Sequence, residues 1–320
     1  DCHTAVTQLE STSMGMLIAR ATLFGCDAAL RNESARIRIT GSSVEGSITG
    51  PALTEDLGLD LSACSVDYAR KHHMPAPYLY VADVAAGMET DVSGLIQRYL
   101  NAAGKTGGVV YLPAGSYYLL NPLVVPEGVE LRGASSIPVR QMNGGTLIYC
   151  GYRVKDVDND SAQIMLGKNA GVSGISFLAF PKKSGTSLKQ SCVVRGRGNS
   201  GVYLVNCGIA SNRSGVDFLQ CDDHFIKKLV CCCYQNAIMA GGKGGMIEGC
   251  LQNGTVLSRS GLPEEYAIVA EDKLFTDVFP ITRKNSHLIT LENAENETVL
   301  NTFGFGLNCH ADIRDSRGIL

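Results

Sequence analysis

The chain has 320 residues, of which 45% belong to the set AVILMFWYC and 18% are charged, so its composition is that of a folded protein rather than a disordered one. A formal net charge of −3, with no long basic run, argues against nucleic-acid binding. No apolar run approaches the roughly 20 residues that a membrane helix requires. These features predict a globular protein whose partners are neither nucleic acid nor the membrane core.

The first 64 residues predict a β-rich segment. Short apolar runs recur at Gly15–Ile18, Thr22–Cys26 and Arg36–Gly46, separated by polar or glycine-containing stretches. We interpret residues 1–64 as terminal coils of a preceding β-helix, with a small β-sandwich as the alternative. Residues 65–87, which include the sequence Pro75-Ala76-Pro77, are predicted to form a linker into a second domain.

The second domain, residues 88–320, opens with the clearest helix signal of the chain. Thr90 or Asp91 is a suitable N-cap, and apolar residues follow at helical spacing from Val92 to Leu100, ending near Gly104. The segment Gly107–Leu120 then has the pattern of two strands joined by a turn at Pro113-Ala114-Gly115. A short amphipathic helix followed by successive short strands is therefore expected.

From Gly171 onward, the strands form a repeat. Segments around four apolar residues can be aligned with one another, and we expect these residues to stack inside the fold: Ile175, Leu204, Leu229 and Ile247. The repeats are too far apart to require hairpins, which favours a parallel β-helix over a β-sandwich. The apolar ending Gly318–Leu320 resembles the start of another strand, so we expect the β-helix to be incomplete at its C-terminus.

Two segments carry a resemblance to a known family. Gly107–Tyr117, which includes Gly-Gly-Val-Val-Tyr-Leu-Pro-Ala-Gly-Ser-Tyr, and Leu123–Gly133 resemble the opening coils of the pectate-lyase-like superfamily. The resemblance covers roughly residues 80–320. It implies an all-β fold, a right-handed parallel β-helix (solenoid) with a short N-terminal capping helix, and action on polysaccharides.

Carboxylates on adjacent coils could supply the chemistry for such a substrate. Outward side chains lie about 4.8 Å apart from coil to coil, so neighbouring coils can place two carboxylates at the ~5–5.5 Å of a retaining glycosidase or the ~6.5–9.5 Å of an inverting one. The candidate catalytic residues are Asp217, Asp222, Asp223 and Glu248, with Glu248 expected to face Asp222 or Asp223 one coil away. The paired aspartates resemble those of polygalacturonases, but the Asn-Thr-Asp, Gly-His-Gly and Arg-Ile-Lys segments of that family are absent.

The sequence thus predicts a carbohydrate-active enzyme, with a glycoside hydrolase as the main hypothesis. A polysaccharide lyase and a non-catalytic glycan-binding β-helix of the tailspike or adhesin type are the alternatives. Side chains that could contact the sugar are one imidazole, one amine and two phenol rings: His224, Lys227, Tyr203 and Tyr234.

Cofactor and location follow from the same hypothesis. No metal-ligand spacing is present, so no cofactor is expected, although a lyase could use Ca²⁺. The twelve cysteines are too sparse for a disulfide scaffold, and we interpret them as small buried residues. A large glycan substrate implies a secreted or cell-surface protein, and an oligomer or further chain segments are compatible with the open solenoid.

Overall fold

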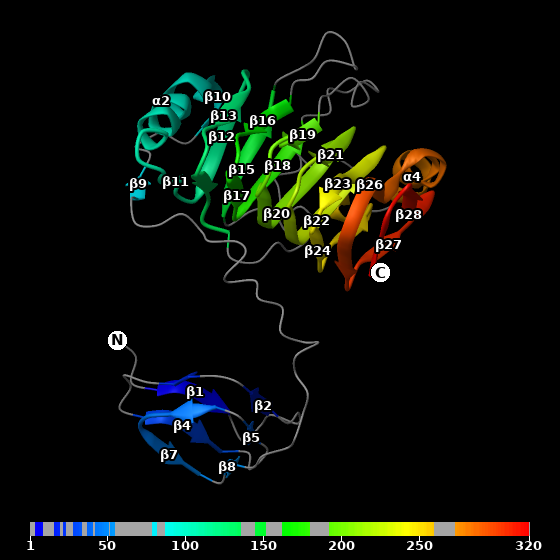
Figure 1. Ribbon diagram of the computed structural model, residues 1–320. Helices are drawn as coiled ribbons and strands as arrows, with labels where there is room; N and C mark the ends of the chain where they lie inside the picture. Colours follow the sequence, from blue (N-terminus) through cyan, green and yellow to red (C-terminus); the bar gives the residue numbers. More distant parts are fainter. Residues whose placement is uncertain are drawn as a thin grey trace. The chain divides into compact units, whose positions relative to one another are not determined.

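The computed structural model describes residues 4–8, 16–19, 22–23, 28–33, 37–40, 42–50, 52–54, 79–81, 87–135, 145–151, 162–179, 192–258 and 273–319. The chain divides into two compact units, Asp1–Asp67 and Tyr68–Leu320. Figure 1 labels the helices and strands of both units, which we describe separately.

The first unit consists of short parallel strands in successive coils. Its strands are β1 (Thr4–Gln8), β2 (Met16–Ala19), β3 (Thr22–Leu23), β4 (Ala28–Asn32), β5 (Ile37–Thr40), β6 (Ser43–Val44), β7 (Ser47–Thr49) and β8 (Ala52–Thr54). They pair in the orders β1-β4-β7, β2-β5-β8 and β3-β6, and every pairing is parallel. Ile18, Leu30, Ile37 and Ile39 form its small apolar core. The unit is therefore a short stack of β-helix coils.

The second unit is a longer solenoid whose coils form three parallel sheets. Sheet A contains β9 (Leu79–Val81), β11 (Gly108–Tyr111), β14 (Val129–Arg132), β17 (Gly171–Ser173), the first halves of β20 (Tyr203–Asn212) and β22 (Phe225–Cys233), β24 (Met246–Glu248), the second half of β26 (His287–Leu300), and β29 (Arg317–Ile319). Of the predicted linker, residues 79–81 belong to this sheet as β9 and Gly87 begins the strand β10 (Gly87–Asp91), while residues 65–78 and 82–86 lie outside the described part.

The chain turns from sheet A into sheet B and then into sheet C before it returns to sheet A. Sheet B contains β10 (Gly87–Asp91), β12 (Gly115–Leu119), β15 (Thr146–Cys150), β18 (Ile175–Ala179), the second halves of β20 and β22, β25 (Leu251–Asn253) and β27 (Phe303–Phe305). Sheet C contains β13 (Leu123–Val125), β16 (Ala162–Leu166), β19 (Cys192–Arg195), β21 (Ser214–Phe218), β23 (Asn236–Lys243), the first half of β26, and β28 (Cys309–Arg314). The predicted right-handed parallel β-helix is confirmed.

Along each strand, successive side chains point alternately into and out of the solenoid, and the inward side chains form the core. Val216 and Phe218 of β21 are fully buried in the central apolar cluster, so the residue between them, Asp217, points to the outer face. The same apolar columns continue from coil to coil in sheet A, where Leu204 and Ile247 stack above and below Ile226. Burial of these columns is the main apolar stabilisation of the solenoid.

The predicted stack was wrong at two of its four positions. Leu229 lies in sheet B opposite Cys207, and Ile175 lies in sheet B opposite Thr146, rather than in the column of Leu204 and Ile247. The reason is the bend between sheets A and B, where Asn206 and Lys228 adopt a positive φ. Each long strand turns there within a few residues, so one apolar run supplies two sheets.

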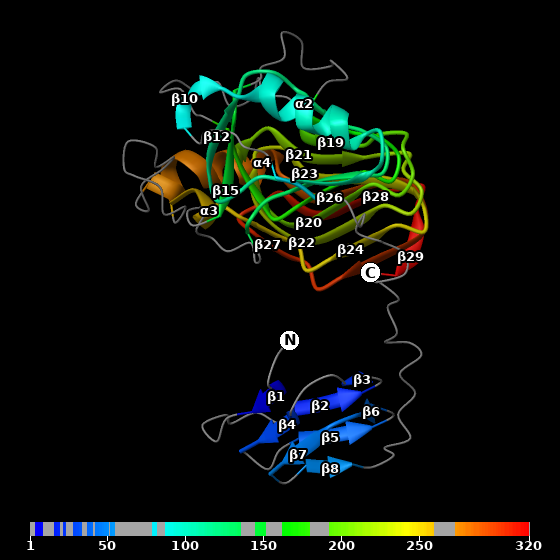
Figure 2. The same cartoon turned by 90° about the vertical axis from the view of Figure 1, so that its left-hand side faces the viewer.

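A helix covers one end of the solenoid, as predicted. The helix α2 (Ser93–Ala103) buries Ile96, Leu100 and Ala103 in the central apolar cluster, and it lies across the end of the stack of coils in Figure 2. Its N-cap position is Val92, while the side chain of Asp91 accepts hydrogen bonds from the backbone and hydroxyl of Ser93. The helix shields the first coil from water.

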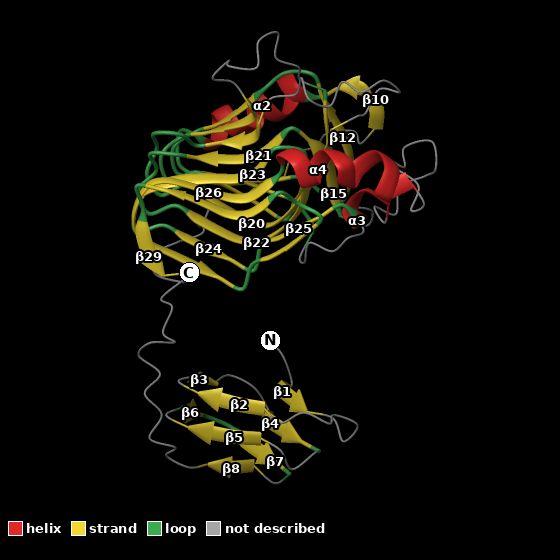
Figure 3. Cartoon of the chain, turned by 90° about the vertical axis from the view of Figure 1, so that its right-hand side faces the viewer, coloured by secondary structure: helices red, strands yellow, loops and turns green. Residues whose placement is uncertain are grey.

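Further helices cover the outer face of sheet B. They are α3 (Thr255–Ser258), the π-helix η3 (Leu274–Val278) and α4 (Phe279–Asn285), and Figure 3 shows α3 and α4 beside the strands. Val256, Leu274 and Phe279 form a second apolar cluster with sheet B residues such as Tyr149 and Leu178. Sheet B is therefore buried on both faces over this region, which leaves sheets A and C to present side chains to a ligand.

Candidate functional site

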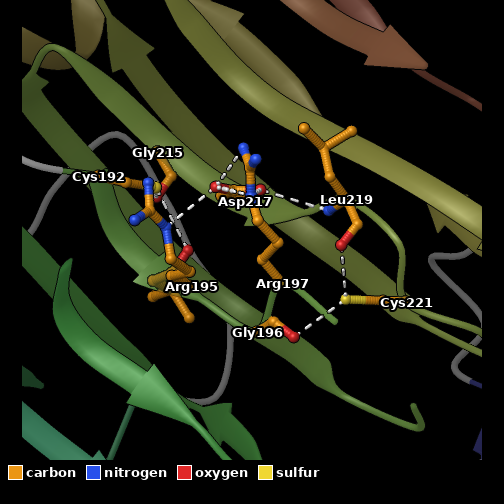
Figure 4. Close-up of polar contacts among 9 residues, drawn as sticks. Cys192, Arg195, Gly196, Arg197, Gly215, Asp217, Leu219 and Cys221 are labelled. Carbon is orange, nitrogen blue, oxygen red and sulfur yellow. Dashed lines mark hydrogen bonds and ion pairs between the residues drawn. The ribbon is translucent and has the colours of Figure 1, made fainter. Parts of the chain in front are cut away.

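The most organised polar group on sheet C surrounds Asp217. Arg195 donates from Nε to Asp217 Oδ2 at 3.0 Å, and Arg197 Nε lies 3.0 Å from the same oxygen and 3.3 Å from Oδ1. The backbone N–H of Leu219 also donates to Oδ1, at 3.3 Å. Figure 4 shows the two arginines converging on this one carboxylate. We call this group the Arg195–Asp217–Arg197 clamp.

The local sequence explains why the two arginines meet Asp217. Arg195 is the last residue of β19 and is the register partner of Asp217 in the next coil. Arg197 follows after Gly196 in the turn that leaves β19. The thiol of Cys221 donates to the carbonyl of Gly196 at 3.1 Å, which ties this turn to the one that leaves β21. The turns of two consecutive coils are thus braced where the arginines emerge.

Burial separates the roles of the clamp residues. The side chain of Asp217 has no exposed surface, whereas those of Arg195 and Arg197 are 14% and 41% exposed. A ligand at this face would therefore touch guanidinium groups and not the carboxylate. This geometry corrects the prediction that Asp217 is a catalytic acid or base, because the residue orients the arginines from beneath.

A second polar group lies farther along the same column of sheet C. The register runs from Asp217 through Met239 and Thr290 to Asp312, three coils away. Asp312 Oδ2 lies 2.6 Å from Arg314 Nη2 and 3.5 Å from His287 Nδ1, and Arg314 Nη1 donates to Glu292 Oε1 at 2.9 Å. We call these four residues the His287 cluster.

Arg314 sets the protonation of Asp312. The hydrogen bond from Arg314, together with its positive charge, holds the pKa of the Asp312 carboxyl below its ordinary value, although partial desolvation opposes the shift. Asp312 is therefore a carboxylate at neutral pH and does not act as a proton donor. It is suited to orient the neighbouring imidazole instead.

Asp222 and Asp223 lie in the turn between β21 and β22, at the corner between sheets C and A. Both side chains are exposed. Asp222 Oδ1 accepts from the backbone N–H of Lys243 at 2.8 Å, and the N–H of Asp223 donates to the carbonyl of Lys243 at 2.7 Å. These contacts fix the turn, and the carboxylate of Asp223 remains at the surface. Of the predicted catalytic residues, these two are the most accessible.

His224 is the buried neighbour of this aspartate pair. Its Nδ1 lies 2.8 Å from the carbonyl oxygen of Cys221, and its Nε2 lies 3.0 Å from Glu297 Oε1. Neither side chain of the His224–Glu297 pair has more than 1% of its surface exposed. The prediction that His224 contacts substrate is corrected by this burial: the ring fastens one coil to a later one.

Glu248 and Lys227 lie on sheet A. The register pairs Glu248 with Lys227 of the preceding coil, and Lys227 Nζ is 3.0 Å from Glu248 Oε2. The expectation that Glu248 faces Asp222 or Asp223 is therefore wrong, because those aspartates lie in the corner turn that precedes Phe225, whereas Glu248 is opposite Lys227. Among the described contacts, no hydrogen bond or ion pair joins any two of the four predicted catalytic residues.

The two predicted aromatic contacts are also buried. The hydroxyl of Tyr203 donates to Glu130 Oε2 at 2.7 Å, and Arg132 Nε donates to the other oxygen of Glu130 at 2.5 Å. Burial and the negative charge of Glu130 raise the pKa of Tyr203. Tyr234 packs in the apolar cluster beneath the helices on sheet B. Neither ring forms the sugar-stacking surface that the sequence suggested.

The described residues include no group of three or more His, Cys, Asp or Glu side chains placed to hold a metal ion. The Ca²⁺ that a lyase could use stays a prediction. The nine cysteines described are free, and eight of them are buried. Burial raises the pKa of the Cys221 thiol to about 12, which makes it unreactive.

No helix in the described ranges has the length and apolar character to cross a bilayer.

Comparisons with known proteins give matches to solved structures alone. No protein-family model matches the sequence, and neither does any curated protein. A putative glycosyl hydrolase from Parabacteroides merdae is 10% identical, with 76% of this chain and 96% of that chain covered and a TM-score of 0.41. A mannuronan C-5 epimerase module from Azotobacter vinelandii is 12% identical, with 75% and 74% covered and a TM-score of 0.43.

A third similar structure is the surface adhesin PfbA of Streptococcus pneumoniae, which is 14% identical, with a TM-score of 0.39. The match covers 75% of this chain and 62% of the adhesin, so it extends over less than two thirds of that protein.

Proposed function

We propose that the protein is a carbohydrate-active enzyme that acts on an acidic poly- or oligosaccharide bound along the outer face of sheet C. The observation that supports this proposal is the Arg195–Asp217–Arg197 clamp. Guanidinium groups match carboxylate and sulfate groups through paired hydrogen bonds, and a buried carboxylate that fixes both side chains reduces the entropy lost on binding.

The length of the polar column supports a polymer rather than a small ligand. Arg195 and Asp312 are separated by four coil steps in the register, which corresponds to about 19 Å at ~4.8 Å per coil. Parallel strands hold the side chains along this line rigidly. An extended chain of sugars could contact both the clamp and the His287 cluster. A polysaccharide of this size implies action outside the cell or at its surface.

Elimination is the cleavage reaction that this face supports best. Hydrolysis requires one carboxyl group to be protonated and a second to be ionised. On sheet C, Asp217 is buried between two arginines and Asp312 is held ionised by Arg314. A lyase instead needs a positive group for the sugar carboxylate and a base for the adjacent carbon, and both kinds of group are present. We therefore favour a polysaccharide lyase.

Glycoside hydrolysis remains the second candidate. Asp222 and Asp223 are both exposed and adjacent in one turn, so this pair supports a hydrolase whose substrate passes over the corner between sheets C and A. The two reactions differ in their products. A lyase produces an unsaturated sugar that absorbs ultraviolet light, whereas a hydrolase produces reducing ends without that absorbance.

The binding proposal is tested with the change Arg197→Gln, which removes one guanidinium and leaves Arg195 to pair with Asp217. Loss of charge-assisted hydrogen bonds worth about 1.5–3 kcal/mol should weaken binding of polygalacturonate, mannuronan or carrageenan roughly tenfold or more. Calorimetric titration at low and high salt measures this loss. Arg98→Gln is the matched control, because Arg98 is an exposed arginine on α2.

The same titration includes neutral dextran. Wild-type protein should prefer the acidic polymers, and added salt should reduce that preference. Equal affinity of Arg197→Gln and wild type, or equally tight binding of dextran, would contradict the assignment of the clamp. Binding of an acidic polymer without any product by either assay would identify a glycan-binding protein rather than an enzyme.

A further inference from the structure

His287 is held in an orientation that the sequence did not suggest. It begins β26, and its side chain is 22% exposed on the outer face of sheet C. Its Nδ1 faces Asp312 Oδ2 at 3.5 Å, and no hydrogen bond to Nδ1 is formed within the described contacts. On the other side of the ring, Asn308 Nδ2 donates to Nε2 at 3.4 Å. The ring is therefore positioned from both sides.

These two contacts favour one tautomer. An amide N–H that points at Nε2 requires a lone pair on that nitrogen, which is the tautomer with the ring proton on Nδ1, the nitrogen that faces the carboxylate of Asp312. A carboxylate 3.5 Å from Nδ1 stabilises the positive charge that forms when Nε2 takes up a proton. The contact from Asn308 to Nε2 is long, so a substrate could replace it. Nε2 is thus placed to act as a base.

The charged groups around the ring support this role. Asp312 faces it directly from β28, and Arg314 holds Asp312 by a bidentate contact. Glu292 on β26 binds the other side of the Arg314 guanidinium. Arg314 is 56% exposed, so it can also attract the acidic group of a sugar bound beside His287. One cluster therefore combines a base, its orienting carboxylate and a surface cation.

We propose that His287 is the catalytic base of the cleavage reaction and that Asp312 is its positioning residue, an inference that rests on the proposed function. Nε2 takes the proton from the ring carbon next to the sugar carboxylate. The electron pair of that C–H bond forms a C=C double bond as the bond from the neighbouring carbon to the glycosidic oxygen breaks. The proton then passes from Nε2 to the departing oxygen, so the imidazole returns to its neutral form and no other reactant is consumed.

The test compares His287→Gln with wild type on polygalacturonate and mannuronan, whose sugars carry the carboxylate that the elimination requires, and follows the ultraviolet absorbance of the unsaturated product. Loss of a positioned base should lower kcat by about 10²-fold or more, with KM changed by less than about threefold. His310→Gln is the matched control, since His310 is an exposed imidazole on β28 whose Nε2 contacts only Thr302 among the described hydrogen bonds. Thermal unfolding of each variant confirms that it is folded.

Two further variants separate catalysis from structure. Free imidazole should restore part of the lost activity to His287→Ala and should not stimulate wild type. Asp312→Asn should lower kcat in the wild-type background but have no further effect in the His287→Gln background, because the two residues act as a unit. Additive effects, or no rescue by imidazole, would contradict the assignment.

The outcomes distinguish this inference from the proposed function. If wild type cleaves a polymer and His287→Gln cleaves it equally fast, His287 is not the base while the enzyme proposal stands. If wild type binds acidic polymers through the clamp but cleaves none of them, the enzymatic part of the proposal and the role of His287 both fail. Reducing ends without unsaturated product would indicate hydrolysis and would also overturn the proposed role.

Discussion

At the scale of single residues, a buried ion pair links coils that are not neighbours in the stack. His224 lies one coil before Gly245, and Glu297 lies one coil after it. A Cβ atom at Gly245 would lie 2.0 Å from His224 Cε1 and 2.4 Å from Glu297 Oε2. The two side chains therefore meet in the space that the missing side chain of Gly245 leaves open.

The titration of His224 makes this link dependent on pH. Burial is the largest influence and lowers the pKa of His224, but the hydrogen bond and the charge of Glu297, the carbonyl of Cys221 and the charge of Asp223 together raise it above its ordinary value of 6.5. A folded-state pKa above the unfolded one means that protonation stabilises the folded protein. This stabilisation is complete below about pH 6.5 and is lost as pH rises through the folded-state pKa.

We therefore predict that the free energy of unfolding of wild type falls as pH rises above about 6.5, and that His224→Gln removes this part of the pH dependence. Urea denaturation at a series of pH values measures both proteins. His310→Gln, which changes an exposed imidazole, should leave the wild-type slope in place. A His224→Gln protein with the wild-type slope would show that other groups cause it.

The clamp shows why residue contacts were only partly predictable from the sequence. Arg195 and Asp217 are 22 positions apart, and their contact depends on the length of one particular coil. The sequence marks Asp217 as a candidate carboxylate but does not fix that length, so the contacts with the two arginines could not be predicted. An alignment of Val194 with Val216 in the core column would have placed Arg195 opposite Asp217, which is the signal that the sequence contains.

At the scale of elements, a glycine in the turn between β23 and β24 and a glycine in the capping helix have different structural roles. Gly245 lies where two coils approach too closely for a side chain, whereas a Cβ atom at Gly94 in α2 would meet nothing within 4 Å. Glycine also leaves the unfolded chain more freedom than alanine does. The same substitution should therefore change stability in opposite directions at the two positions.

We predict that Gly245→Ala lowers the free energy of unfolding by about 1–3 kcal/mol, because the added methyl group displaces the buried His224–Glu297 pair. Gly94→Ala should raise it by up to about 1 kcal/mol. Urea denaturation of the two single variants at one pH provides the comparison. A neutral Gly245→Ala would mean that the corner relaxes without cost, and the close approach would then have no structural role.

Element type was more predictable than element register. Helix α2 and the first strands could be predicted from local patterns. Apolar residues recur at helical spacing over Val92–Leu100, and glycines separate the short apolar runs of Gly107–Gly133. The bend at Lys228 is different, because a lysine with positive φ has no distinctive sequence signature. Because of that bend, Leu229 lies in sheet B, and its position relative to Leu204 could not be predicted from the local pattern.

At the scale of the whole molecule, stability is distributed along the stack. Each coil contacts its neighbours, so the core grows by addition rather than around one centre. The apolar cluster of Ile18, Leu30, Ile37 and Ile39 is separate from the central cluster of the second unit, which begins at Val92. The helix α2 closes that second cluster at its first coil. The clamp and the His287 cluster both lie in the second unit.

These features predict that the fragment Tyr68–Leu320 folds by itself and keeps its ligand-binding site. Its free energy of unfolding should agree with the corresponding transition of the full chain within about 0.5 kcal/mol, because each unit has an apolar cluster of its own. Its Kd for an acidic polymer should lie within about twofold of the full-chain value. Urea denaturation and calorimetric titration of the two proteins measure these quantities. A fragment that fails to fold would show that residues 1–67 contribute to the stability of the second unit. A fragment that folds but binds at least tenfold more weakly would show that residues 1–67 contribute to ligand binding.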